Sequence, residues 1–159
     1  GDPRPSFGSQ TEKDNAVKKA FNDVIAKYGG SDEASVAHYE LGSLAADAGQ
    51  VAEAEKHFRA AAEAGDSNYQ SVAKLSLAQI LNNQSKTAAA EKILRDLIAS
   101  PTPLVSKEQA TFTLVRILAQ KNPAEARKLL APYEKDSRVS IARSAAALSS
   151  ELPQVAGGK

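Results

Sequence analysis

The feature that most constrains this chain is an internal repeat. The segment 35–68 (SVAHYELGSLAADAGQVAEAEKHFRAAAEAGDSN) matches the run 73–94 at an offset of 36 residues, and that run matches the segment 110–130 at 37, which closes to 36 after one residue is lost in the turn. The positions that coincide are apolar: Leu41, Leu77 and Leu114; Gly42, Ala78 and Val115; Ala45, Leu81 and Leu118; Ala54, Ala90 and Ala126; Phe58, Leu94 and Leu130. A fixed period in this range with paired apolar patterns predicts an array of helical hairpins.

The three copies resemble tetratricopeptide repeats, whose pattern places Leu-Gly on the first helix of a hairpin and Ala-x3-Phe on the second. The first copy keeps Leu41, Gly42, the turn residue Gly49, Ala54 and Phe58. It departs from the family pattern at three positions, where the expected Trp, Tyr and Pro are replaced by His38, Ala45 and Asp66. The resemblance covers roughly residues 21–133. It implies an all-α, right-handed helical-hairpin solenoid of about eight helices: a half repeat, three hairpins and a C-terminal capping helix.

Apolar periodicity and capping residues predict where these helices begin and end. We expect helices over about 11–28, 31–48, 51–64, 67–83, 86–99, 103–120, 123–132 and 138–152. The expected N-terminal caps are Thr11 with Asp14 three residues later, Ser31, Asp66 or Ser67, Thr102 before Pro103, Asn122 before Pro123, and Asp136-Ser137. Pro132 lacks an amide proton and should cut or bend its helix early. The last helix should close the open end of the array, because Ile141, Ala142, Ala145, Leu148 and Leu152 share one side and the other side is mostly polar.

The two ends of the chain read differently from the repeats. Residues 1–10 (GDPRPSFGSQ) are rich in Pro, Gly and Ser and predict a flexible leader, residues 11–152 form the solenoid domain, and residues 153–159 predict a disordered tail. The sequence has no Met, even at its start, so we expect a processed product from which an upstream segment was removed. The half-repeat start and the Ala-rich units also resemble the soluble part of bacterial envelope proteins with one N-terminal membrane anchor, among them the ancillary subunit of the Sec translocon. That resemblance favours a periplasmic or cell-envelope location, with the cytoplasm as the alternative.

Charge and composition exclude several classes of partner. The chain has 20 Lys and Arg against 19 Asp and Glu, a net charge of +1, which gives no electrostatic reason to bind nucleic acid or an acidic membrane surface. No apolar run approaches 18 residues, so this fragment should make no membrane contact. We expect a monomer or a weak homo-oligomer.

No residue pattern predicts catalysis. The two histidines, His38 and His57, stand 19 residues apart without a third metal ligand in view, and we interpret both as packing residues of the hairpin. The chain has no Cys, no nucleophile motif and no phosphate-binding glycine motif. We therefore expect no enzyme activity, no cofactor and no metal.

Binding of a protein partner is the function that remains. In the resembling family, the first helix of each hairpin lines a concave groove that holds a peptide or a partner helix. Carried over by register, the groove residues of this chain are Tyr39, Ser43, Asp47, Leu75, Gln79, Asn82, Asn83, Phe112, Arg116 and Gln120. Tyr39, Leu75 and Phe112 would form an apolar column, although Leu75 and Phe112 could instead pack beneath neighbouring helices. The alternative function is a structural module whose convex face or open ends mediate assembly or self-association.

Overall fold

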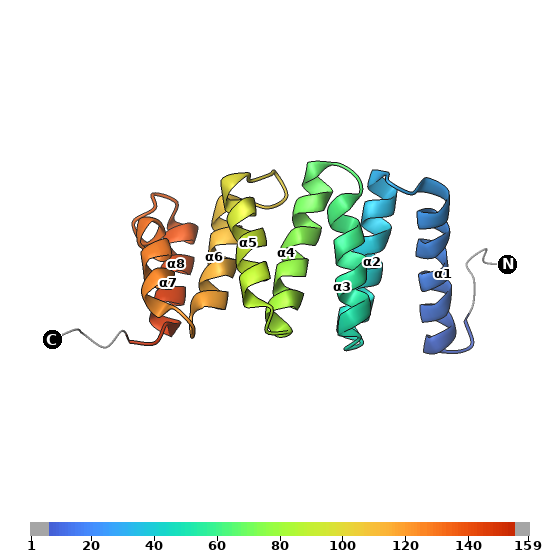
Figure 1. Ribbon diagram of the computed structural model, residues 1–159, viewed down its shortest axis with the longest axis horizontal. Coiled ribbons are helices and arrows are strands. Elements are labelled where there is room, and N and C mark those ends of the chain that lie inside the picture. Colours follow the sequence, from blue (N-terminus) through green and yellow to red (C-terminus); the bar gives the residue numbers. More distant parts are fainter. Residues whose placement is uncertain (1–6, 155–159) are drawn as a thin grey trace. The chain divides into compact units, whose positions relative to one another are not determined.

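The computed structural model describes residues 7–154, and eight α-helices make up most of that range (Figure 1). Their bounds are α1 (Gln10–Tyr28), α2 (Asp32–Asp47), α3 (Val51–Glu63), α4 (Ser67–Asn83), α5 (Thr87–Ala99), α6 (Lys107–Leu118), α7 (Pro123–Glu134) and α8 (Val139–Glu151). No strand occurs among the described residues. The expected all-α helical-hairpin repeat fold is confirmed. No helix within residues 7–154 combines the length and the apolar character needed to cross a membrane.

The chain divides into two compact units, residues 1–73 and 74–159, and the boundary falls inside α4. The expected leader and tail include residues 1–6 and 155–159, which lie outside the described range, so those two predictions stay predictions. The single domain expected over 11–152 likewise stays a prediction. The two units are described separately below.

In the first unit, α1, α2 and α3 pack as successive antiparallel neighbours (Figure 1). The interior is made mostly of small side chains from α2 and α3, which allow the two backbones to approach. The buried apolar side chains of these two helices are Ala34, Ala37, Leu41, Ala45, Ala54, Phe58 and Ala61. α1 carries no buried residue, so it covers α2 from one side only.

Gly42 is required where α2 meets α3. A Cβ atom at this position would lie 2.8 Å from the Cδ1 and Cε1 atoms of the Phe58 ring, closer than carbon atoms can approach without a shift. The repeat register shows how the other copies solve the same problem. Ala78 and Val115, which are larger than glycine, stand in register with Gly42, and the smaller Leu94 and Leu130 replace Phe58. Within the repeats, a larger residue on the first helix is thus matched by a smaller one on the second.

The turns inside the hairpins also repeat. The Gln50 amide donates to the Ala45 carbonyl at 2.8 Å, and 36 residues later the Lys86 amide donates to the Leu81 carbonyl at 2.8 Å. The residue before each donor has a positive φ: Gly49 at 70° and Ser85 at 61°. Glycine adopts this left-handed conformation at little cost, whereas serine is strained there. The 36-residue period therefore extends to the backbone conformation of the turn.

In the second unit, α6 packs against α5, α7 and α8. Its core is richer in leucine than that of the first unit and includes Leu94, Leu97, Leu114, Leu118, Leu130 and Leu148. The expected sidedness of the terminal helix agrees with its burial. Ala145, Leu148 and Leu152 are buried on one side, whereas Arg143, Ser144, Ala147, Ser150 and Glu151 are exposed on the other.

Polar contacts fix the ends of α8 to the rest of the second unit. The Arg127 guanidinium of α7 donates to the carbonyls of Leu152 and Pro153 at 3.0 Å each, which satisfies carbonyls that the end of a helix leaves unpaired. At the other end, Arg138 pairs with Glu108 of α6 and, at 2.8 Å, with Asp136. The hydrogen bonds from Arg138 lower the pKa of Asp136 to about 2. The pKa of Glu108 is lowered first by a hydrogen bond from its backbone amide and second by Arg138.

Several predicted helix ends are confirmed. Ser31 caps α2, since its hydroxyl accepts the Ala34 amide at 3.2 Å, and Asn122 caps α7, since its side chain accepts the Glu125 amide at 3.2 Å. Asp66 caps α4 through the amides of Asn68 and Tyr69 at 2.8 and 3.3 Å.

Three predicted helix caps were wrong, and Pro132 does not have one of the two effects expected of it. Ser9, not Thr11, caps α1: its hydroxyl accepts the Glu12 amide, and the Glu12 carboxylate in turn accepts the Gly8 amide. Ser106 caps α6 four residues after the predicted Thr102, whose hydroxyl instead accepts the Val105 amide within the loop. Asp136 accepts the Arg138 amide in a turn before α8, and no side chain caps that helix. Pro132 does not end α7, which continues to Glu134, because the one lost backbone bond would lie on an exposed side of the last turn.

Candidate functional site

The second unit contains a small polar cavity between α4 and α6, with a volume of about 170 Å³. Its lining residues are Gln79, Asn82, Asn83, Thr113, Arg116 and Ile117. Three of these come from α4 and three from α6, in each case at spacings of one, three and four residues. Because residues three and four apart lie on the same side of a helix, each helix presents one short patch to the cavity.

The polar groups at the cavity offer both donors and acceptors. The Asn82 side-chain oxygen accepts a hydrogen bond from the Thr87 hydroxyl at 3.2 Å, which orients the amide. The Thr113 hydroxyl donates to the Gln109 carbonyl at 2.9 Å and keeps its lone pairs as acceptors. Side-chain amides can pair with the backbone groups of an extended peptide, because each offers a carbonyl and an NH2 group.

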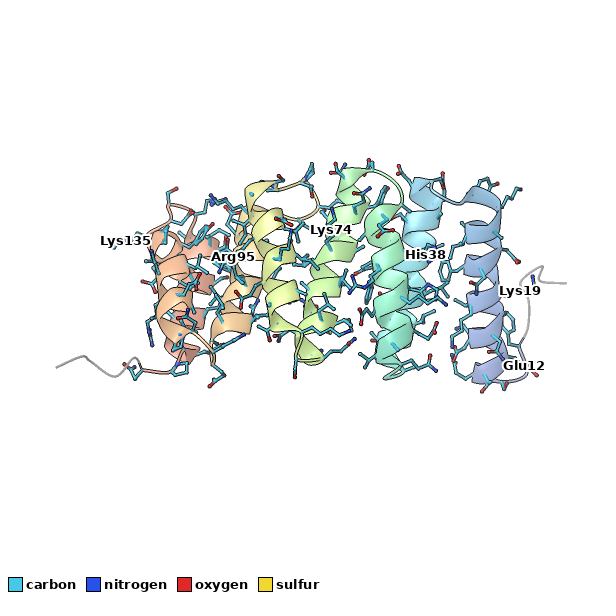
Figure 2. All side chains as sticks on the ribbon, in the orientation of Figure 1. Glu12, Lys19, His38, Lys74, Arg95 and Lys135 are labelled. Atoms are coloured by element: carbon cyan, nitrogen blue, oxygen red, sulfur yellow. The ribbon has the colours of Figure 1, made fainter. Side chains whose placement is uncertain are left out.

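Arg116 supplies the positive charge of the cavity. Its side chain is exposed, and no ion pair engages it within residues 7–154. This distinguishes it from Arg95 of α5, labelled in Figure 2, which pairs with Glu125 at 2.7 Å. Arg138 is likewise held by two carboxylates. A guanidinium without an internal partner can pair with a carboxylate of a ligand through two parallel hydrogen bonds.

Four of the ten groove residues predicted from the sequence line this cavity: Gln79, Asn82, Asn83 and Arg116. Three more belong to the second unit but lie outside it. Leu75 is half-buried on α4 and Gln120 is exposed just after α6. Phe112 is only 8% exposed, and its ring meets Tyr133 of α7 edge-on with centroids 5.4 Å apart. That contact supports the packing alternative for Phe112.

The remaining three predicted groove residues belong to the first unit. Tyr39 is half-buried, with its ring centroid 5.6 Å from that of Phe58. The Ser43 hydroxyl donates to the Tyr39 carbonyl at 3.0 Å, one turn earlier on the same helix. Asp47 is exposed at the last position of α2. Whether a ligand engages these residues stays a prediction.

The repeats of this chain match the model of a known domain family. The model of the tetratricopeptide repeat-like domain matches residues 7–101, which is more than half of the 159 residues. The chain belongs to the tetratricopeptide repeat-like domain family. Neither the curated proteins nor the solved structures contain a significant match.

The matched range of this tetratricopeptide repeat-like chain, residues 7–101, contains α1 to α5. Domains of this kind generally mediate protein–protein interaction and typically act as scaffolds rather than enzymes. Half of the polar cavity, namely the α4 residues, lies inside the matched range, and the α6 residues lie beyond it.

Sequence reasoning missed Thr113 and Ile117 of the cavity. The register with the first copy predicts a column of every fourth residue on α6, which selects Phe112, Arg116 and Gln120. A helix turns once in about 3.6 residues, so a surface around Arg116 also includes positions three before and one after it. Applying that geometry to Arg116 alone would have found both residues.

The first unit has a larger hollow of about 420 Å³. It is lined by Phe21, Val24, Asp32, Glu33, Val36, Ala37 and Tyr69. Both acids already serve the fold: Asp32 accepts the Asp66 amide at 2.7 Å, and a hydrogen bond from Ser31 lowers the pKa of Glu33. The fold thus already engages the two carboxylates, and the other five lining residues are apolar or aromatic.

The two histidines meet at the α2–α3 hairpin, on which Figure 2 labels His38. Their Nδ1 atoms are 3.1 Å apart, and the ring centroids are separated by 5.3 Å. Within the described part of the chain, no group of three or more His, Cys, Asp or Glu side chains is placed to hold a metal ion.

Proposed function

We propose that this chain binds a segment of a partner protein at the polar cavity between α4 and α6, and that the segment carries an acidic group facing Arg116. The observation that carries the proposal is the convergence on one cavity of three side-chain amides and a guanidinium that no described residue pairs. In ligand sites, a few converging polar groups fix the orientation of the bound group. Membership of a protein-binding family supports a protein as the partner.

The chemistry of the lining indicates what kind of segment would fit. A cavity of about 170 Å³ is too small for a folded domain but accommodates a side chain or a chain terminus. The amides of Gln79 and Asn82 can pair with peptide groups, and Ile117 offers an apolar contact. Arg116 would add a charge-assisted bond, which is shorter and stronger than a neutral one.

Site-specific photocrosslinking tests this proposal on the native protein. A photoreactive residue at Asn83, which is exposed at the cavity, should capture a partner in cells that produce the full-length chain. The matched control places the same residue at Lys92, which is exposed on α5 and away from the cavity lining. Capture at Asn83 that disappears in the Arg116→Ala background supports the proposal. The proposal is contradicted if the residue at Lys92 captures the partner equally well, or if capture at Asn83 is unchanged in the Arg116→Ala background.

A second candidate is an assembly role through the first unit. The observation that favours it is the apolar hollow of that unit together with exposed Val36 and Tyr69, 37% and 38% exposed. Exposed apolar patches commonly mark protein contacts. A photoreactive residue at Tyr69 separates the two roles, since it should capture a partner only if this surface is in use.

The placement in a bacterial cell envelope stays a proposal that rests on the sequence resemblance alone. The compartment of the partner captured at Asn83 would test it. A periplasmic partner supports the placement, and a cytoplasmic enzyme or ribosomal partner contradicts it.

A further inference from the structure

A polar contact between two imidazole rings, those of His38 and His57, joins α2 to α3. The imidazole of His57 is only 16% exposed, so water can replace little of this contact. Two facing ring nitrogens at 3.1 Å require one proton between them, with one nitrogen donating and the other accepting. The contact thus depends on the number of protons that the two rings hold.

The surroundings indicate which ring donates when both are neutral. The Glu53 carboxylate lies 3.9 Å from Nε2 of His57, the nitrogen that faces away from His38. A carboxylate on that side favours the tautomer with a proton on Nε2. Nδ1 of His57 is then the acceptor, and His38 donates through its own Nδ1–H.

We propose that the His38–His57 pair is a proton-sensitive latch, which holds α2 to α3 while at most one extra proton is bound and releases them when both rings are protonated. The first extra proton can be tolerated, because an imidazolium can still donate to a neutral neighbour. The second puts an N–H on both facing nitrogens and two positive charges within one contact. The hydrogen bond is then replaced by repulsion.

Burial lowers the pKa of both rings, whereas the surrounding charges act on the two rings differently. Burial and then the other charges lower the pKa of His38, where His57 and Lys56 both oppose a proton. Burial also lowers the pKa of His57, although Glu53 partly offsets it. Among residues 7–154 these are the charged groups that act on the rings, and α1, which also packs on α2, adds none.

The direction of the pH effect follows from these shifts. Because the pKa of each ring is lowered below its ordinary value of 6.5, the open hairpin binds more protons than the closed one. The contribution of the latch is complete above about pH 6.5 and declines as the pH falls below that value. His38 and His57 are the only histidines in the sequence, and it has no Cys. Between about pH 5 and pH 7 they are therefore the side chains expected to titrate.

Hydrogen exchange of the full chain tests the latch. After correction for intrinsic exchange rates, amides of α2 and α3 should open more often at pH 5 than at pH 7, by up to about 25-fold for each ring whose protonation the closed hairpin blocks. Amides of α6 and α7, which contain no histidine, serve as the internal control. An equal change in both regions, or none in α2 and α3, overturns the proposal.

Variants that leave both rings in place provide a second test that does not depend on removing packed side chains. NMR titration of the rings should show a lower pKa for His57 in Glu53→Gln and a higher one in Lys56→Gln, because these two charges act on it with opposite signs. The pH-dependent loss of the α2–α3 contact should then extend to lower pH in Glu53→Gln and end at higher pH in Lys56→Gln, because the pKa of the closed hairpin sets where the loss ends. As a separate control, the double variant His38→Gln/His57→Gln, which removes both rings, should lose the pH dependence. The proposal is overturned if the pH dependence of α2–α3 opening is the same in Glu53→Gln and Lys56→Gln as in the parent.

Discussion

Replacing Gly42 by alanine tests the packing of the first hairpin most sharply. The new Cβ would lie 2.8 Å from two ring carbons of Phe58, and Phe58 is only 3% exposed, so the ring has no open space to move into. Overpacking of a core costs about 1–3 kcal/mol. Alanine is about 1 kcal/mol more favourable than glycine inside a helix, which offsets part of that cost. The expected net loss of unfolding free energy is therefore about 0–2 kcal/mol.

The repeat itself supplies the control that separates clash from propensity. Phe58→Leu reproduces the residue found in the other two copies and should lose stability through the smaller side chain. In the double variant Gly42→Ala/Phe58→Leu, the alanine has room, so its helix propensity should become a gain of about 1 kcal/mol relative to Phe58→Leu. Chemical denaturation of the parent, the two single variants and the double variant measures the coupling energy. If Gly42→Ala changes the free energy of unfolding by the same amount in the parent and in the Phe58→Leu background, the two side chains do not clash and the reasoning is refuted.

Three further predictions concern the second unit. Ser85 adopts a left-handed backbone conformation with φ 61°, which glycine adopts at little cost. Ser85→Gly should therefore raise the free energy of unfolding, measured by denaturant titration, by about 0.5–1 kcal/mol. An unchanged or lower value would contradict the proposed strain at Ser85. Ala90→Leu places a larger side chain at a position with no exposed surface and should cost about 1–3 kcal/mol, so an unchanged midpoint would mean that the repeat register is wrong. Arg138→Gln should flatten the loss of stability on acidification below about pH 4.5, because the lowered pKa values of Asp136 and Glu108 give stability that is present above their ordinary values and lost as the pH falls. An acid-unfolding profile that matches the parent would show that the Arg138 contacts do not form.

Much of the fold could be predicted because its signals are local and repeated. Apolar spacing recurs three times, so errors in one copy are corrected by the others. Ser31 and Asn122 were identifiable as caps, since Ser31 follows the helix-ending Gly29-Gly30 and Asn122 directly precedes Pro123, a residue favoured in a first turn. Where several polar residues compete, the sequence cannot rank them. Ser9 and Thr11 are both good caps two residues apart, and it is the Ser9 hydroxyl that accepts the Glu12 amide at 3.1 Å.

The loop before α6 shows the same limit on a larger scale. Both Thr102 and Ser106 can cap a helix, and Pro103 is favourable in a first turn. The structure uses Ser106 because Val105 is buried, with 1% exposure, which fixes the preceding residues in a loop. Burial of a single loop residue depends on tertiary packing and leaves no periodic signal.

The candidate site was partly predictable for a related reason. Repeat register identified Arg116 and the α4 amides, because equivalent positions in the family line the groove. It could not show that Phe112 turns toward Tyr133, a partner from another helix 21 residues later. Nor could it pair His38 with His57, since each residue alone reads as an ordinary packing residue. Contacts between helices of this kind come from the fold and not from the pattern of either helix.

The most direct test of the central claim is chemical-shift mapping of the full chain with the peptide segment captured at Asn83. The account predicts that the largest amide shifts fall on the cavity residues of α4 and α6, that Arg116→Ala weakens binding at least about fivefold, and that the charge-matched Lys92→Ala leaves it unchanged. Added salt should reduce the difference between parent and Arg116→Ala, since it screens an exposed charge pair. Shifts centred on α1 and α2, with an Arg116→Ala affinity equal to that of the parent, would contradict the claim and favour the assembly role of the first unit.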